Sequence, residues 1–304
     1  MSSAPFGRLL TAMATPFTAD GAVDYPRAQQ LARALVASGT QGLLVTGTTG
    51  EAPTLSNEEK VRLWEVVKEA VGSAAAVIAG AGNYNTAESV DLSREAMHVG
   101  VDGILATVPY YSKPPQSGLE KHFRAIAAAV DLPVIPYNIP GRTSVNMTAE
   151  TTVRLSRVPN IVGVKEASGN LDQIGQICRE TDDAFCVWSG DDAITLPILA
   201  LGGYGVVSVA SHLVGKQIAR MIDCAVEGVP GEAAEIHHRL VPLISALFPP
   251  TSTSPIPLKY ALKQVGFDCG PLRLPLDEID PKSAAGVDAA LAKTQVDLPK
   301  PSDR

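Results

Sequence analysis

Eight short apolar runs, rich in β-branched residues, recur along the first two thirds of the chain. Runs of this length between turn residues predict buried β-strands. Because the runs are nearly continuous in apolar residues rather than alternating, they indicate parallel strands that are covered on both faces. They lie at residues 9–13, 43–46, 76–79, 103–107, 133–137, 161–165, 185–188 and 205–209.

Segments of helical period separate these runs. The clearest begins at Ser56, which forms a capping box with Glu59 ahead of an apolar face. Eight strand and helix units close naturally into a (β/α)8 barrel. The alternative, a doubly wound open sheet, usually has a glycine-rich dinucleotide turn after its first strand, and residues 14–17 lack one. The expected helices span residues 24–38, 56–71, 86–99, 117–130, 148–157, 170–180, 191–201 and 212–227.

The repeat stops near residue 230. We therefore expect residues 1–230 to form the catalytic barrel and residues 231–304 to form a helical C-terminal domain. Its helical pieces are expected at about 231–247, 255–265 and 278–292, between proline-rich turns. The tail from Asp297 to Arg304 holds two prolines and few apolar residues, so we expect it to be frayed.

Composition narrows the classes of partner. The 304 residues carry a net charge of −7 without a cluster of lysine or arginine, which argues against a nucleic-acid surface and favours a small-molecule substrate. The four cysteines have neither paired nor metal-like spacing, so we expect reduced thiols and a cytoplasmic location. Residues 1–7 do not resemble an export signal, and no run of about 18 apolar residues predicts a membrane span.

Neither a metal nor a cofactor is expected. His237 and His238 are adjacent, so on a helix they diverge and do not chelate together. Cysteine, histidine and carboxylate residues do not recur at metal-ligand spacing, and the chain has no phosphate loop of the Walker type.

The first candidate for chemistry is Lys165, at the end of the sixth run. Catalytic groups of an α/β barrel gather at the carboxyl ends of its strands. An amine buried there loses proton affinity and becomes a nucleophile toward a carbonyl, as Schiff-base catalysis requires. The structural alternative is a lysine paired with a buried carboxylate, and the position favours the chemical role.

The fifth run ends in Tyr137 and is followed by Arg142. A tyrosine hydroxyl can relay protons during imine formation, and a guanidinium can bind a substrate carboxylate. Considered alone, each residue could equally have a structural role. Tyr137 could simply cover the core, and Arg142 could simply bind a loop carbonyl.

Other strand ends add weaker signals. The second run leads into Gly47-Thr48-Thr49-Gly50-Glu51, where backbone N–H groups and two hydroxyls can approach a small anion. The fourth run leads to Tyr110 and Tyr111, of which at most one is expected to face the cavity. Gly190 and Val207 follow on the seventh and eighth runs as pocket-lining residues. Asp191 and Asp192 could also line the pocket, although capping of the next helix is the favoured role.

Together these motifs resemble the pyruvate-dependent class I aldolase superfamily of N-acetylneuraminate lyase and dihydrodipicolinate synthase, from about Arg8 to Leu276. Arg142 after Tyr-Asn-Ile-Pro-Gly is similar to the 4-hydroxy-tetrahydrodipicolinate synthase branch. This resemblance implies that Lys165 forms an imine with pyruvate. Its enamine would then attack L-aspartate-4-semialdehyde, in an early step of lysine and diaminopimelate biosynthesis. The shared motifs are residues 47–51, 109–111, 137–143, 163–167 and 203–208.

The resemblance also implies roles for single residues. Tyr137 would act as acid and base, with Thr48 and a Tyr111 from a neighbouring subunit completing a proton relay. The resemblance implies a homotetramer, built as a dimer of tight dimers, which is the usual assembly of the family. The substrate-binding residues would be Thr49 for the pyruvate carboxylate, Arg142 for the semialdehyde carboxylate, and Gly190 and Val207 as pocket lining.

One departure concerns regulation. Relatives that are inhibited by lysine bind it with histidine and asparagine at positions that here hold Lys60 and Tyr84, whereas Glu88 and Tyr110 match. The charge of Lys60 would repel a cationic effector. The sequence therefore predicts weak or absent lysine inhibition.

Two other functions are alternatives to the synthase reaction. One is a related pyruvate aldolase that acts on a sugar-acid aldehyde of the 2-keto-3-deoxygluconate type, against which Arg142 argues. The other is a non-catalytic barrel that binds a carboxylate ligand. The joint presence of Lys165, Tyr137 and Thr48 argues against that second function.

Overall fold

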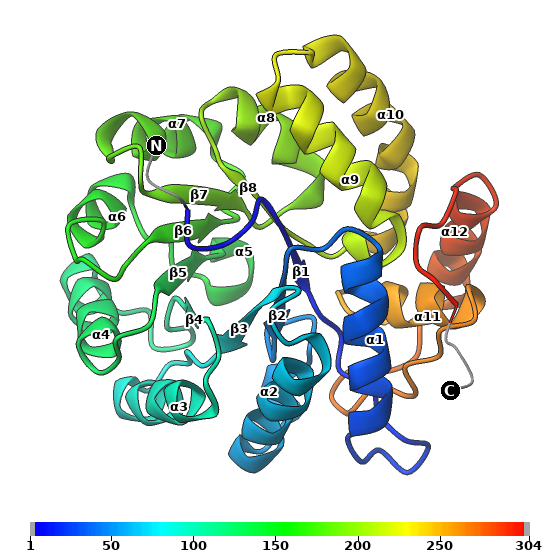
Figure 1. Cartoon of the computed structure of the whole chain (residues 1–304), viewed down its shortest axis with the longest axis horizontal. Helices are drawn as coiled ribbons and strands as arrows, with labels where there is room; N and C mark the ends of the chain where they lie inside the picture. The colour runs from blue at the N-terminus through cyan, green and yellow to red at the C-terminus, as the bar shows by residue number, and fades with distance from the viewer. Residues whose placement is uncertain (1–3, 301–304) are drawn as a thin grey trace.

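A closed barrel of eight parallel strands forms the centre of the molecule, in the order β1 to β8 (Figure 1). The computed structural model describes residues 4–300. The barrel confirms the predicted fold class and excludes the doubly wound sheet. Its strands are β1 Leu9–Ala12, β2 Gly42–Val45, β3 Ala76–Gly80, β4 Gly103–Thr107, β5 Val134–Asn138, β6 Gly163–Glu166, β7 Cys186–Ser189 and β8 Gly205–Ser208.

A ring of helices covers the outside of this barrel (Figure 1). Their starts follow the sequence signals: the Asp24 carboxylate accepts from the Arg27 N–H, and Ser56 forms the expected capping box with Glu59. The ring contains α1 Tyr25–Ala37, α2 Asn57–Val71, α3 Thr86–Val99, α4 Gln116–Ala128, α6 Ala149–Leu155, α7 Leu171–Glu180, α8 Thr195–Ala200 and α9 Ser211–Val226.

Three short elements at the carboxyl ends of strands were not predicted. They are the 3₁₀ helix η1 Ala52–Thr54, the helix α5 Pro140–Thr143 and the 3₁₀ helix η2 Asp192–Ile194. Each of them comes between a strand and the ring helix that follows it. The segment expected as one helix over 191–201 is therefore η2 followed by α8.

Strands and covering helices pack closely against each other. All four residues of β1, β2, β6, β7 and β8 are buried, as expected for parallel strands that are covered on both faces. Trp64 on α2 and Trp188 on β7 are the largest fully buried side chains. Trp64 donates its indole N–H to Thr46 Oγ1 at 2.8 Å, so the covering helix also holds the loop after β2.

The C-terminal helices lie on the α1 and α9 side of the ring (Figure 1). They are α10 Pro230–Leu247, α11 Ile256–Gln264 and α12 Pro281–Leu291. Because α10 packs along α9, the division into domains at residue 230 stays a proposal.

Part of the expected frayed tail is ordered. The Asp297 N–H donates to Leu213 O at 2.7 Å, and its carboxylate accepts from the Gln217 N–H at 3.1 Å. Leu298 is buried as well. These hydrogen bonds and the burial of one apolar side chain attach Asp297 and Leu298 to α9. Residues 301–304 lie outside the described residues.

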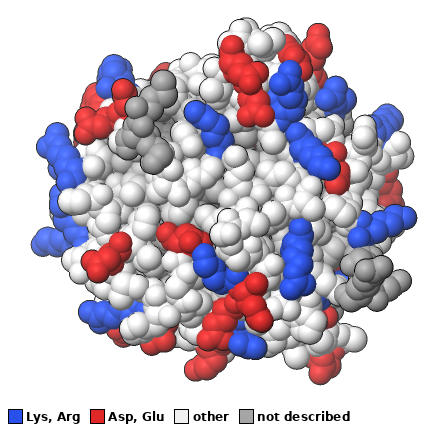
Figure 2. All heavy atoms as spheres, viewed as in Figure 1, with Lys and Arg blue, Asp and Glu red and all other residues white. Residues whose placement is uncertain are grey.

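Charged side chains of both signs alternate near the edge of the face in Figure 2, around a centre with little charge. Among residues 4–300, no helix is both long enough and apolar enough to cross a membrane.

Candidate active site

Lys165 lies near the carboxyl end of β6, and its side chain is 5% exposed. It pairs in register with Tyr137 on β5, so the two side chains point to the same side of the sheet. On the other side, a Cβ atom added to Gly190 would come within 3.1 Å of Lys165 Cε. The glycine therefore leaves room for the lysine side chain, and its role as pocket lining stays a prediction.

The Lys165 amine has a perturbed proton affinity. Burial lowers its pKa to about 7, the charge of Asp192 opposes this change, and the charge of Arg142 lowers the pKa further. A large share of the amine is therefore neutral at physiological pH. A free lone pair is the form that attacks a carbonyl carbon.

Tyr137 faces this amine directly. The Lys165 Nζ atom lies 4.0 Å from the centroid of the Tyr137 ring. Burial raises the pKa of the Tyr137 phenol, against an opposing effect from the charge of Arg142. The hydroxyl therefore stays protonated and can serve as a proton donor beside the amine.

Arg142 is exposed on α5, at the edge of the same site. The segment that follows this helix is held from β5 by Asn138, whose side-chain oxygen accepts from the Met147 N–H at 2.9 Å. Asn138 also donates to the buried Glu166 carboxylate at 3.1 Å. This buried amide and acid pair fixes the strand ends that carry Tyr137 and Lys165.

The loop after β2 carries Thr48 and Thr49, of which Thr48 is half-buried and Thr49 is buried. It starts at Thr46 with φ 59° and ends at Glu51 with φ 56°, and such left-handed non-glycine residues cost about 1–3 kcal/mol each. The loop approaches β3 so closely that a Cβ on Gly80 would lie 2.3 Å from Thr46 O. A strained loop kept in one shape is typical of a functional site.

The remaining predicted residues occupy different surroundings. Val207 is buried in β8, at the same end of the barrel as Lys165. Tyr111 is 92% exposed, with φ 69°, so it does not enter the cavity of its own chain. Lys165, Tyr137, Gly190 and Arg142 are thus brought together within one chain, whereas Tyr111 is not.

Asp192 corrects a prediction. Asp191 caps the following helix as expected, accepting from the Ala193 N–H at 2.8 Å. Asp192 instead turns inward: its carboxylate accepts from Ser208 Oγ at 2.5 Å and from the Val209 N–H at 2.9 Å. This buried carboxylate ties the ends of β7 and β8 together and influences the pKa of Lys165. Two adjacent acids match the capping pattern equally well, so the sequence did not distinguish them.

The four residues of the expected effector site form one cluster between α2, α3 and the loop after β4. The rings of Tyr84 and Tyr110 lie edge to face, with centroids 5.1 Å apart. Burial lowers the pKa of Lys60, and the charge of Glu88 partly offsets that effect. The Lys60 amine therefore lies near Glu88 in this cluster, and the assignment of these residues to an effector site stays a prediction.

Comparison with known proteins agrees with this geometry. Residues 5–294 match the model of the dihydrodipicolinate synthetase family. A 4-hydroxy-tetrahydrodipicolinate synthase from Symbiobacterium thermophilum is 54% identical over 96% of this chain and 99% of its own. One from Dehalococcoides mccartyi is 54% identical over 96% of this chain and 98% of its own.

A solved structure is similar over the same length. The crystal structure of DHDPS from Cyanidioschyzon merolae with lysine bound shares 49% identity and a TM-score of 0.94, over 96% of this chain and 99% of that one. These likenesses confirm the resemblance inferred from the strand-end motifs. The chain belongs to the dihydrodipicolinate synthetase family.

Proposed function

We propose that this chain condenses pyruvate with L-aspartate-4-semialdehyde to give 4-hydroxy-tetrahydrodipicolinate, through a Schiff base on Lys165. The observation that carries the proposal is the buried Lys165 amine, with a pKa lowered to about 7, beside the protonated Tyr137 phenol. Family membership supports the choice of both substrates, which serve lysine biosynthesis.

The first half of the reaction makes the imine. The Lys165 lone pair attacks the C2 carbonyl carbon of pyruvate, the electrons of the C=O double bond move to the oxygen, and a proton passes from the nitrogen to that oxygen to give a carbinolamine. A second proton, delivered from Tyr137, lets that hydroxyl leave as water, and the nitrogen lone pair closes the C=N bond. The buried phenol suits this step because it stays protonated until the substrate oxygen needs its proton.

The second half forms the carbon–carbon bond. Loss of a proton from C3 of the imine gives an enamine, whose C3 attacks the aldehyde carbon while the aldehyde oxygen gains a proton. The amino group of the adduct then attacks the imine carbon. This closes the ring and expels the Lys165 amine, so the catalyst is regenerated without any oxidant or reductant.

Two carboxylates must be bound for these steps. We assign the pyruvate carboxylate to Thr49 and the backbone beside it, since this loop is buried and presents hydroxyl and N–H donors. Arg142, exposed at the edge of the site, suits the carboxylate of the incoming semialdehyde. Gly190 and Val207 would shape the pocket between them.

We further infer an assembly of tight dimers, paired into a homotetramer. The strongest support is Tyr111, which is 92% exposed and stands in a left-handed conformation on the loop after β4. In a tight dimer the ring would enter the partner's site and complete a relay with Thr48 and Tyr137. The four free cysteines also suit the cytoplasm, where thiols stay reduced.

A comparison of acceptors tests the proposed reaction. The purified chain is supplied with pyruvate and either L-aspartate-4-semialdehyde or glyceraldehyde, and the initial rates of pyruvate consumption are compared. We expect the semialdehyde to be strongly preferred, because only its carboxylate can engage Arg142. A higher rate with glyceraldehyde would instead identify a sugar-acid aldolase, and no consumption with either would indicate a carboxylate-binding barrel.

A further inference from the structure

The carboxylate of Glu51 is fully buried, and both of its oxygens are held by the C-terminal part of the chain. Lys259 Nζ on α11 donates to Oε1 at 2.7 Å. The backbone N–H of Arg273 donates to Oε2 at 3.0 Å. The partner of the loop after β2 is therefore a segment that follows the whole barrel in sequence.

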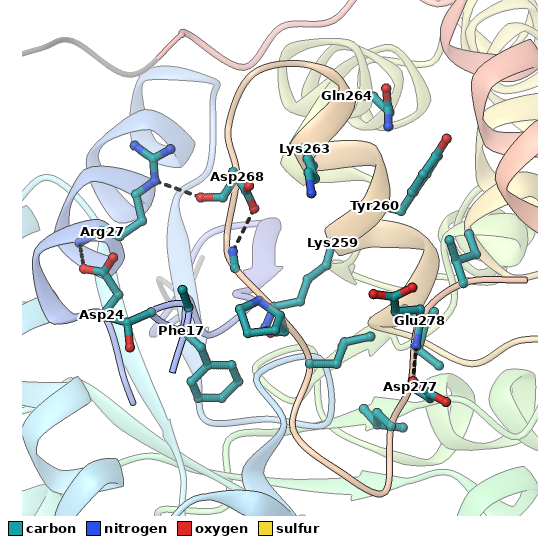
Figure 3. Close-up of a pocket in the computed structure, with 18 of the residues that line it drawn as sticks. Phe17, Asp24, Arg27, Lys259, Tyr260, Lys263, Gln264, Asp268, Asp277 and Glu278 are labelled. Atoms are coloured by element: carbon teal, nitrogen blue, oxygen red, sulfur yellow. Dashed lines mark hydrogen bonds between the residues drawn. The ribbon is translucent and has the colours of Figure 1, made fainter. Parts of the chain in front are cut away.

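Lys259 is itself held on several sides. Its side chain is 4% exposed, and its Nζ atom donates a second hydrogen bond to Pro271 O at 2.8 Å. The same atom lies 4.3 Å from the centroid of the Phe17 ring, so the amine is enclosed by an aromatic face and two oxygens. Figure 3 shows the lysine leaving α11 in the direction of Phe17, at the inner wall of a groove of about 1150 Å³.

A second ion pair from the same segment serves a different element. The Arg273 guanidinium binds the Glu59 carboxylate at 2.6 Å, at the start of α2. This pair is partly exposed, whereas the pair of Glu51 and Lys259 is buried. Both pairs attach the C-terminal segment to the barrel, but only the pair of Glu51 and Lys259 contacts the loop after β2. Variants of the two pairs therefore separate an effect on this loop from an effect of attachment in general.

Glu51 is the end point of the strained loop that carries Thr48 and Thr49. Its N–H donates to Thr48 O at 3.1 Å, and the preceding carbonyl of Gly50 accepts from Thr15 Oγ1 at 2.7 Å. A left-handed glutamate persists only where its surroundings hold it. Release of its carboxylate would let the backbone relax and move both threonines, and a displacement of about 1 Å at a reacting group can cost on the order of 100-fold in rate.

We propose that Glu51 and Lys259 are positioning residues for the reaction at Lys165, with their buried ion pair fixing the loop that presents Thr48 and Thr49. The C-terminal helices thereby control pyruvate binding and proton transfer without contacting the substrate. This inference rests on the proposed Schiff-base function. It gives the C-terminal part of the chain a role in the chemistry in addition to its packing against the barrel.

The test compares the double variant Glu51→Gln/Lys259→Met with wild type and with Glu59→Gln. The double variant removes both charges together, because a single change would leave an uncompensated buried charge and could prevent folding. Glu59→Gln weakens the second ion pair and keeps a capping side chain on α2. Each full-length protein is examined for its thermal midpoint and for the rate at which borohydride traps pyruvate on Lys165.

We expect the folded double variant to trap pyruvate at about one tenth of the wild-type rate or more slowly still. We also expect its KM for pyruvate to be raised. Glu59→Gln should trap pyruvate at the wild-type rate, whatever its change in thermal midpoint. A folded double variant that traps pyruvate as fast as wild type would overturn the proposal and leave the ion pair a purely structural role. Equal slowing in Glu59→Gln would also overturn it, because the effect would then follow general loosening.

A third variant covers the case in which the double variant does not fold. Glu51→Asp keeps the charge but shortens the side chain, so the carboxylate must shift to reach Lys259. Slower trapping by a folded Glu51→Asp protein supports the proposal, and an unchanged rate overturns it. If wild type itself forms no adduct on Lys165, the proposed function fails, and that outcome is separate from every comparison between variants.

Discussion

The Lys165 amine lies 4.0 Å from the centre of the Tyr137 ring, and the two residues are direct neighbours across β6 and β5. Burial acts on both groups in a useful direction: it frees the amine of its proton and keeps the proton on the phenol. The structure therefore places a largely neutral amine and a protonated phenol side by side.

Removal of the Tyr137 hydroxyl should separate packing from chemistry. Tyr137→Phe keeps the ring against the amine but loses the proton donor, so we expect kcat to fall by about 10²–10⁴-fold. The thermal midpoint should change little. Steady-state kinetics and a melting curve measure the two effects. Tyr204→Phe is the matched control, because that ring packs edge to face on Trp188 outside the site, and it should keep full activity.

The rate of imine formation should depend on pH through Lys165. Since the folded pKa is about 7, the neutral amine becomes populated as the pH rises, and the single-turnover rate should climb between about pH 6 and pH 8 and then level off. Stopped-flow mixing with pyruvate, in buffers of constant ionic strength, gives the profile. A rate that is still rising near pH 10 would mean that the amine has an ordinary pKa.

Arg142 should affect the second substrate more than the first. Arg142→Met removes the proposed partner of the semialdehyde carboxylate, and loss of such a charged hydrogen bond costs about 1.5–3 kcal/mol, or roughly 10- to 160-fold in KM. Because the charge of Arg142 also lowers the pKa of Lys165, the midpoint of the pH profile should move upward.

Arg142→Lys gives the comparison at constant charge. It should leave the midpoint of the pH profile in place. KM for the semialdehyde should still rise, because an ammonium group does not form the bidentate contact that a guanidinium makes with a carboxylate. An equal rise in KM for pyruvate in both variants would argue against the assignment.

Lysine should inhibit this chain weakly or not at all. Lys60 places a positive charge beside Glu88 in the cluster where a cationic effector would bind. Titration of the steady-state rate with L-lysine measures the effect, and inhibition at sub-millimolar concentration would refute the prediction. The variant Lys60→His/Tyr84→Asn introduces the side chains expected at these positions in lysine-sensitive relatives. It should become more sensitive to inhibition by lysine.

Much of the fold was predictable because it depends on local patterns. Apolar runs and capped amphipathic segments repeat along the barrel, and each strand and major helix was expected within a few residues of its observed bounds. Lys165, Tyr137 and Gly190 were predictable for a related reason: parallel strands bring their carboxyl ends together, so unusual residues at those ends share one site.

Other features depend on long-range contacts that have no periodic signal. The sequence did not indicate that Glu51 pairs with Lys259, because these residues lie 208 positions apart and neither breaks a local pattern. Asp192 was misread for a similar reason, since its partners Ser208 and Val209 belong to the next strand and loop. The short helix α5 was missed because its proline and glycine suggest a turn.

The central claim is that pyruvate is held covalently on Lys165, and borohydride reduction tests it most directly. The protein is treated with borohydride in the presence and absence of pyruvate, digested, and analysed by mass spectrometry of its lysine peptides. We predict a reduced pyruvate adduct on Lys165 alone, formed only when pyruvate is present, with the buried Lys259 unmodified. An adduct on another lysine, or none on a folded and active protein, would contradict the account.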